Sequence, residues 1–188
     1  MKIIQLHNNE IALIKRAVKN KRDAQHTLFK MHAPKMLSVC RYYISDLQYA
    51  EEAMLNGFFK VFTKLNNYNF QGSFEGWIRK IMVRESISFI RSLKKIEFPV
   101  EEVQTTDYSN NINIEIGVAE IQYLIDQLPQ GYRIVFVMYA IEGYKHQEIA
   151  AELKISVGTS KSQLFKARKL LQQQINVLNS KKNVSNKV

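Results

Sequence analysis

Residues 144–171 read YKHQEIAAELKISVGTSKSQLFKARKLL, and this stretch decides the fold of the C-terminal half. Its apolar residues fall at helical spacing on two short segments, which predicts a helix over 146–153 and a second helix from near Val157. Residues 154–156 form the turn between them. The residues expected to be buried are Ile149, Ala150, Leu153, Val157, Leu164, Ala167 and Leu171. Two short helices joined by so tight a turn are typical of a helix-turn-helix.

The outer face of the second helix carries long polar side chains and one aromatic ring: Lys161, Ser162, Phe165, Lys166 and Lys169. Lys can pair with guanine, Ser with several acceptors and Phe with a thymine methyl group in the major groove of DNA. Lys166, Arg168 and Lys169 would neutralise phosphates. We therefore expect this helix to bind duplex DNA, the alternative being an ordinary helical hairpin with a basic surface.

In the N-terminal half, an apolar stripe over 49–65 predicts a helix with one buried face. Its members are Ala50, Ala53, Met54, Gly57, Phe58, Val61, Phe62 and Leu65. Leu55 and Phe59 are four residues apart but lie outside this stripe. A helix that is apolar on two faces either lies deep in a bundle or offers one face to a partner, and both alternatives stay open.

A turn-rich segment over 66–72, NNYNFQG, precedes a helix that Ser73 can cap. This helix directs Phe74 and Trp77 toward a core and also carries a basic stripe, whose members are Lys80, Arg84, Arg91 and Lys95. Cations follow phosphates and aromatic planes stack on unpaired bases, so the combination suits single-stranded or opened DNA. A merely solvated basic face with Trp77 in the core is the alternative.

Charge divides the chain into three parts. Lys and Arg number 27 against 17 Asp and Glu, a formal net charge of +10, which indicates a polyanionic partner. Residues 97–115 nevertheless contain no Lys or Arg and five acids. This acidic segment is either a solvated linker or a strand that occupies a basic channel. We expect an all-α chain with helical domains over 1–95 and 116–176, an acidic linker over 96–115 and a polar tail over 177–188. The second domain should also hold an amphipathic helix over 120–128, with Ile121 on its apolar face, and a segment over 132–141 that is apolar on nearly all sides and therefore buried.

Other classes of protein find little support in the sequence. The lone Cys40 excludes an internal disulfide, no phosphate-binding G-x-x-x-x-G-K-[ST] motif occurs, and the four His residues show no metal-ligand spacing. The sequence contains no run of 18 apolar residues, so it predicts no transmembrane span. Its first ten residues are too polar for a signal-peptide core. We expect a cytoplasmic protein without catalytic residues, metal or cofactor.

Three segments together resemble the extracytoplasmic-function (ECF) sigma factors of the bacterial sigma-70 family. AEEAMLNGFFKVF (50–62) is similar to the family's region 2.2, and FQGSFEGWIRKI (70–81) is similar to its promoter-melting and −10-reading part. Residues 124–171 resemble region 4 nearly end to end. The likeness spans about residues 20–175, with the motifs in the expected order.

The resemblance implies an RNA polymerase sigma factor that directs core polymerase to promoters. The helix over 49–65 would bind core RNA polymerase through Glu51, Glu52, Leu55, Asn56 and Phe59. The single-stranded −10 element would contact Phe70, Ser73, Phe74, Trp77, Lys80 and Arg84. The double-stranded −35 element would contact Lys161, Ser162, Phe165, Lys166 and Lys169. The acidic linker would follow the RNA-exit path of the polymerase, and an anti-sigma factor is the expected regulatory partner.

Two other classes of protein keep some support from the same residues. A helix-turn-helix regulator with a helical sensing domain would bind DNA without the polymerase. A helical protein-interaction module with a basic surface would bind no DNA. Transcription assays with core polymerase distinguish the first from a sigma factor, and the salt dependence of DNA binding distinguishes the second.

Overall fold

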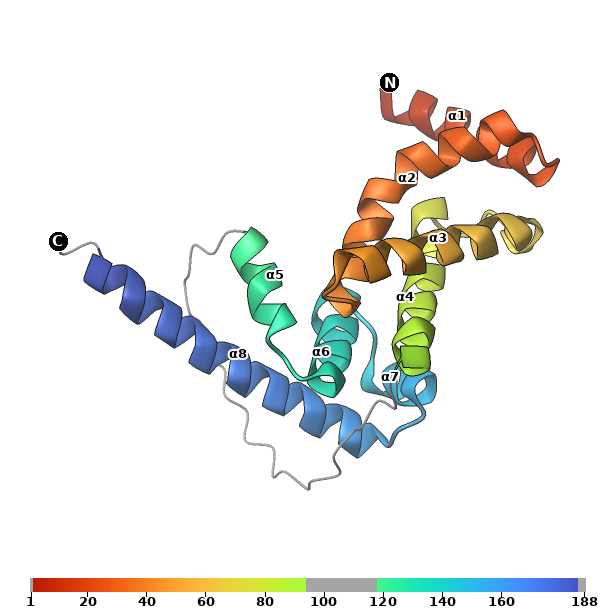
Figure 1. Cartoon of the computed structure of the whole chain (residues 1–188). Helices are drawn as coiled ribbons and strands as arrows, with labels where there is room; N and C mark the ends of the chain where they lie inside the picture. The colour runs from red at the N-terminus through yellow and green to blue at the C-terminus, as the bar shows by residue number, and fades with distance from the viewer. Residues whose placement is uncertain (1, 94–117, 186–188) are drawn as a thin grey trace. The chain divides into compact units, whose positions relative to one another are not determined.

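The computed structural model describes the backbone of residues 2–93 and 118–185, and side chains within 9–93 and 120–179. These residues form helices and turns, with no strand among them, so the all-α prediction is confirmed. The chain divides into two compact units, Met1–Lys94 and Lys95–Val188 (Figure 1). The acidic linker predicted over 96–115 lies outside the described residues.

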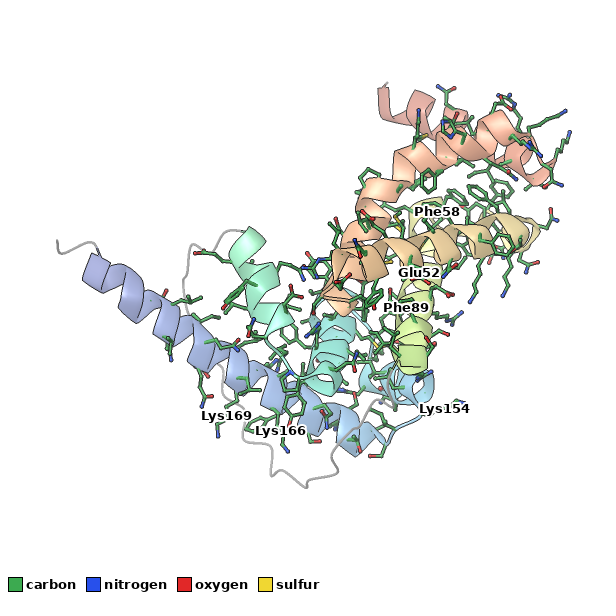
Figure 2. The ribbon with its side chains drawn as sticks, viewed as in Figure 1. Glu52, Phe58, Phe89, Lys154, Lys166 and Lys169 are labelled. Atoms are coloured by element: carbon green, nitrogen blue, oxygen red, sulfur yellow. The ribbon has the colours of Figure 1, made fainter. Side chains whose placement is uncertain are left out.

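The first unit is a bundle whose elements are α1 (Lys2–Val18), α2 (Arg22–Tyr43), α3 (Leu47–Thr63), the 3₁₀ turn η1 (Leu65–Asn67) and α4 (Phe74–Leu93). Helix α2 contacts α1, α3 and α4, and α3 packs along α4. The stripe predicted over 49–65 is the buried face of α3, with Phe62 half-buried and Leu65 buried in η1. The ring of Phe58 meets Phe29 of α2 at 4.8 Å between centroids, on the side of α3 that Figure 2 shows turned toward α2.

Two small residues, Gly57 and Cys40, are buried between the helices of the first unit. A Cβ atom at Gly57 of α3 would overlap the sulfur of Met82 in α4, so glycine permits the close approach of these helices. Cys40 of α2 is fully buried, and burial raises the pKa of its thiol to about 11. The nearby Ser86 hydroxyl offsets part of this rise in pKa, and the Glu85 carboxylate adds to it. Cys40 is therefore a neutral core residue at neutral pH.

The second unit consists of α5 (Val118–Asp126), α6 (Gln130–Phe136), the π-helical turn η2 (Val137–Ile141), α7 (His146–Leu153) and α8 (Val157–Ser185). Helix α8 contacts α5, α6 and α7 and so organises the unit. Gly143 has a φ of +74°, which suits glycine and lets the chain turn from η2 toward α7.

Two expectations for the second unit need correction. Ile121 is 42 % exposed, because the buried face of α5 centres on Leu124 and Ile125. The segment over 132–141, predicted to be buried on nearly all sides, exposes Tyr139 and Ala140, where the π-helical turn directs them outward. Within the predicted polar tail, α8 continues to Ser185, because extending a formed helix needs no new nucleation.

Candidate polymerase and nucleic-acid interfaces

The loop over 68–73 is closed by a cluster of aromatic rings. The Tyr68 hydroxyl donates to the Gly72 carbonyl at 2.8 Å, which ties the two sides of the loop together. The Tyr68 ring lies 5.0 Å from that of Phe70, 5.2 Å from Phe74 and 5.5 Å from Trp77, between centroids. Burial and the nearby Glu10 carboxylate raise the pKa of Tyr68, so its hydroxyl remains a donor at neutral pH.

Phe70 is held in an unusual backbone conformation at the tip of this loop. Its φ is +59°, in the left-handed region that aromatic residues rarely occupy, at a cost of roughly 1–2 kcal/mol. The ring is nevertheless 45 % exposed. The Asn69 side chain accepts from the Gln71 N–H at 3.1 Å and so supports the turn. The strain therefore presents a flat apolar surface to solvent, of the kind that stacks on an unpaired base.

Helix α4 continues this surface away from the loop. The Ser73 hydroxyl accepts from the Gly76 N–H at 3.1 Å, so Ser73 caps the helix as predicted from the sequence. Trp77 is half-buried, while Lys80 and Arg84 are exposed. Because these three residues follow a 3, 4 spacing, they lie along one side of α4. An extended strand that stacked at the loop would meet these cations next.

One member of the predicted −10 set does not belong to the surface. The Phe74 side chain is only 1 % exposed and packs among Tyr68, Trp77 and His32. The Phe74 ring therefore has almost no exposed surface in this structure, although it was predicted to contact DNA. As the first residue of α4, Phe74 faces the bundle and supports Tyr68 and Trp77 from below.

The outer face of α3 is the second candidate surface. All five residues predicted to bind the polymerase, Glu51, Glu52, Leu55, Asn56 and Phe59, are exposed. Leu55 is 54 % and Phe59 70 % exposed, and they are adjacent on the helix surface because they are four residues apart. Two neighbouring exposed apolar side chains flanked by acidic ones are typical of a face that a partner covers.

The third candidate surface belongs to the helix-turn-helix, whose geometry follows from local capping. Lys154 ends α7 with a φ of +58°, and the N–H of Ile155 returns to the Ala150 carbonyl at 3.1 Å. The Ser156 hydroxyl then accepts from the Thr159 N–H at 2.8 Å and caps α8. The angle between the two helices is further fixed by buried side chains, namely Ile149, Leu153, Leu164 and Ala167.

Four of the five residues predicted to read the −35 element reach solvent. Lys161 and Lys169 are exposed, and Phe165 and Lys166 are half-buried. Figure 2 shows Lys166 and Lys169 on the side of α8 that faces away from α6. Of the residues expected on the opposite, buried face, Val157 and Leu171 are only half-buried.

Ser162 is the exception, since it is only 7 % exposed and its hydroxyl donates back to the Thr159 carbonyl at 3.0 Å. A helical side chain covers the turn before its own Cα, so Phe165 and Lys166 lie over Ser162. The Ser162 hydroxyl, which was predicted to face DNA, is therefore mostly covered in this structure.

A cluster that the sequence did not reveal joins the start of α7 to α8. The Nδ1 atom of His146 lies 2.9 Å from the Ser160 hydroxyl, and the His146 ring stacks on Tyr139 at 4.6 Å. The guanidinium carbon of Arg168 lies over the Tyr139 ring, 5.6 Å from its centroid. Burial, followed by Lys161 and Arg168, lowers the pKa of His146. No motif marks these residues, because only the fold brings η2, α7 and α8 together.

Metal centres and membrane spans are absent from the residues that the structure describes. The described part of the chain contains no group of three or more His, Cys, Asp or Glu side chains that could hold a metal ion. None of the helices within 2–93 and 118–185 is both long and apolar enough to cross a membrane.

Comparisons with known proteins agree with this division of the chain. Residues 28–96 match the family model for sigma-70 region 2, and residues 119–171 match the model for sigma-70 region 4. Together the two stretches cover more than half of the chain. The first match contains α3, the aromatic loop and α4, and the second contains the helix-turn-helix.

Curated relatives and solved structures point the same way. The chain is 27 % identical over 155 residues to the ECF RNA polymerase sigma factor SigE of Mycolicibacterium smegmatis, covering 77 % of this chain and 58 % of that one. It is 25 % identical over 177 residues to the ECF sigma factor SigW of Bacillus subtilis, covering 86 % and 94 %. In fold it resembles the sigma factor RpoE of Bartonella quintana, solved with the anti-sigma factor NepR (TM-score 0.54, 17 % identity, 81 % of this chain and 96 % of that chain).

The chain therefore belongs to the sigma-70 family. Within that family it is an RNA polymerase sigma factor of the ECF type, as its sequence resemblance implied.

Proposed function

We propose that the protein binds core RNA polymerase and directs it to promoters by contacting the −35 element with its second unit and the opened −10 element with its first. The observation that carries this proposal is the presence, in one chain and in family order, of an exposed aromatic loop and a helix-turn-helix. We take residues 1–95 and 116–176 as the two functional domains. The linker over 96–115 would join them, and residues 177–188 would follow as a tail.

The −35 contact falls on α8. Lys161 and Lys169 are exposed cations, and Lys166 lies between them on the same side of the helix. Lys can donate to guanine acceptors or to phosphates, and the half-buried Phe165 ring can meet a thymine methyl group. The Ser162 hydroxyl is hydrogen-bonded within the helix, so this residue would support Phe165 and Lys166 from beneath.

The −10 contact falls on the loop and on α4. The exposed Phe70 ring offers a stacking surface to a base that leaves the duplex. Trp77 belongs to the same aromatic cluster through Tyr68, and Ser73 is exposed at the start of α4. Lys80 and Arg84 would meet the following phosphates. Stacking of a base on an aromatic ring contributes about 1–3 kcal/mol, which offsets part of the cost of unpairing. Opening thus follows from binding energy, and no catalytic residue or cofactor is needed.

The polymerase contact falls on the outer face of α3. Leu55 and Phe59 would lose their exposed apolar surface on binding, with Glu51, Glu52 and Asn56 forming the polar margin. An anti-sigma factor is a further partner, because the RpoE structure that shares this fold was solved with one. A protein with these partners acts in the cytoplasm.

Transcription in vitro tests the proposal. Purified protein is added to core RNA polymerase on genomic DNA, and the run-off transcripts are sequenced. We expect transcripts that start downstream of a shared pair of −35 and −10 sequences. If no promoter-specific transcript appears and the protein still binds duplex DNA, it is a regulator that acts without the polymerase.

The α3 surface has its own test. We expect Leu55→Asp with Phe59→Asp to weaken binding to core polymerase at least tenfold, because two buried charges would lack partners. Lys30→Glu introduces an acid at an exposed position of α2, outside the proposed contact, and should have little effect. Unchanged affinity of the double variant for core polymerase would exclude this face as the docking surface.

A further inference from the structure

A basic turn joins α1 to α2 and has no role in the contacts described so far. It consists of five exposed cations, Lys15, Arg16, Lys19, Lys21 and Arg22. The acid that follows them, Asp23, forms an ion pair with Arg16 across the turn. Among the described residues the other four cations form no ion pair. The turn therefore displays a dense and largely uncompensated positive charge.

Helix formation accounts for only part of this charge. Lys15 and Arg16 end α1, where cations interact favourably with the helix dipole. Lys21 and Arg22 lie instead at the start of a helix, because Lys21 is the N-cap of α2 and Arg22 its first residue. Cations are unfavourable at the positive end of a helix, and Lys21 makes no side-chain capping bond there. Local stability thus favours a different pair of residues at positions 21 and 22.

The turn is also rigid. Asn20 has a φ of +56°, and the N–H of Lys21 donates to the Arg16 carbonyl at 3.2 Å, which closes the chain reversal. Ala17 of α1 and Ala24 of α2 are almost fully buried, and the two helices pack against each other. The backbone that carries the cations is therefore ordered before any partner binds, which lowers the entropy lost on binding.

The basic turn belongs to the same end of the first unit as the aromatic loop. Helix α1 contacts η1, which leads directly into the loop, and Figure 1 shows the α1–α2 turn at the same end of the unit as the end of α3. The Glu10 carboxylate of α1 acts on the Tyr68 hydroxyl of the loop. Lys19 follows Glu10 by nine residues, or about 14 Å along the helix.

We propose that the basic turn binds the phosphates of promoter DNA next to the segment held by the aromatic loop. This inference rests on the proposed function, since it extends the −10 contact by a backbone contact. A phosphate backbone fits the turn better than a protein surface does. The turn offers Lys and Arg without an exposed large apolar side chain, whereas protein interfaces are poor in Lys and depend on apolar anchors.

The test compares single-charge variants in the holoenzyme. The probe is a fork-junction DNA with an unpaired non-template −10 strand, its sequence taken from a start site mapped by run-off transcription. Lys21→Ser removes one cation and supplies a favourable N-cap. Lys30→Gln removes one exposed cation from the middle of α2 and is the matched control. Affinity is measured by fluorescence anisotropy over a range of KCl concentrations.

We expect Lys21→Ser to weaken fork binding about threefold and to reduce the slope of log K against log salt by about 0.7–0.9, while Lys30→Gln changes neither. Lys21→Ser with Arg22→Gln should weaken binding about tenfold. The melting temperature of the first unit should rise or stay unchanged in both Lys21 variants, which separates a DNA contact from misfolding.

Two outcomes overturn the proposal. Fork binding that matches the Lys30→Gln control shows that the turn does not contact DNA. Weaker binding of the variants to core polymerase without DNA shows that the turn is a protein contact instead. A wild-type holoenzyme that fails to bind the fork at all is a different result, because it contradicts the proposed function rather than this inference.

Discussion

The aromatic loop and the turn of the helix-turn-helix both join two helices, yet they are stabilised in different ways. At the helix-turn-helix, Lys154 adopts a positive φ and Ser156 caps the next helix, so residues within one turn satisfy the backbone. At the loop, Phe70 adopts a similar φ, but its conformation depends on Tyr68 and on rings from α4. Local capping produces a stable shape by itself, whereas a strained loop needs its tertiary surroundings.

The largest expected effect concerns the support of the loop. Phe74→Ala removes a buried ring that touches Tyr68, Trp77 and His32, and should lower the free energy of unfolding of the first unit by about 3–5 kcal/mol. Trp77 is the single tryptophan of the chain, so its fluorescence reports this unit alone. Phe74→Leu, which fills most of the same space, should cost much less. A loss of only about 1 kcal/mol in Phe74→Ala would show that the loop does not depend on this core.

A smaller effect compares the two capping serines. Ser156→Ala should destabilise the second unit and Ser73→Ala the first, each by about 1 kcal/mol, because each hydroxyl accepts one N–H of its helix. Hydrogen exchange of the amides in α8 and α4 measures the two effects separately. If Ser73→Ala also weakens binding to single-stranded −10 DNA beyond its effect on stability, Ser73 contacts the DNA as predicted.

Removing one hydroxyl tests how the loop is held. Tyr68→Phe keeps the ring but loses the hydrogen bond to the Gly72 carbonyl, with an expected loss of about 0.5–1.5 kcal/mol in stability. Because the loop would sample other shapes, we expect a larger loss in −10 strand binding than in −35 duplex binding. Equal losses in both would contradict a positioning role for Tyr68.

Phe70→Gly should separate stability from function. Glycine adopts a positive φ without strain but makes the unfolded chain more flexible, so the free energy of unfolding should change by less than about 1 kcal/mol. The exposed ring is lost, and promoter opening should fall sharply in a permanganate footprint of the −10 element. Normal opening by this variant would mean that another residue receives the unpaired base.

The smallest expected effect is the pH dependence of the second unit. The pKa of His146 is lowered in the folded unit, so the unfolded chain binds the proton more readily. Stability from this residue is then present above its ordinary pKa, near 6.5, and is lost as the pH falls below that value. His146→Asn should therefore make the stability of α8 depend less on pH between 5 and 8 than in the wild type, as measured by hydrogen exchange. An unchanged dependence would exclude His146 as a titrating group there.

The sequence predicts the helices well, because their signals are local. Apolar spacing places α3, α7 and the start of α8, and the capping residue Ser73 marks the start of α4. It also separates Leu55 and Phe59 from the buried stripe of α3. These features depend on residues three or four positions apart, which a single chain displays directly.

What the sequence does not predict depends on contacts between distant residues. The strain at Phe70, the hydrogen bond of Tyr68 and the cluster around His146 arise only when separate helices meet. Spacing placed the Ser162 hydroxyl on the outer face, but its bond to Thr159 and the longer side chains that follow it withdraw it from solvent. The polarity of Ser162 thus predicted which face of the helix it lies on, but not how exposed its side chain is.

The buried thiol of Cys40 allows the transient opening of the first unit to be measured without an attached label. Only the thiolate attacks a disulfide reagent, and at neutral pH a pKa of about 11 leaves very little of it in the folded protein. A colorimetric disulfide such as Ellman's reagent should therefore react with this chain only as fast as the bundle opens. Because the chain has one cysteine, the rate of that reaction reports the transient opening of the first unit. The same rate can be measured in an assembled holoenzyme if the polymerase cysteines are blocked beforehand.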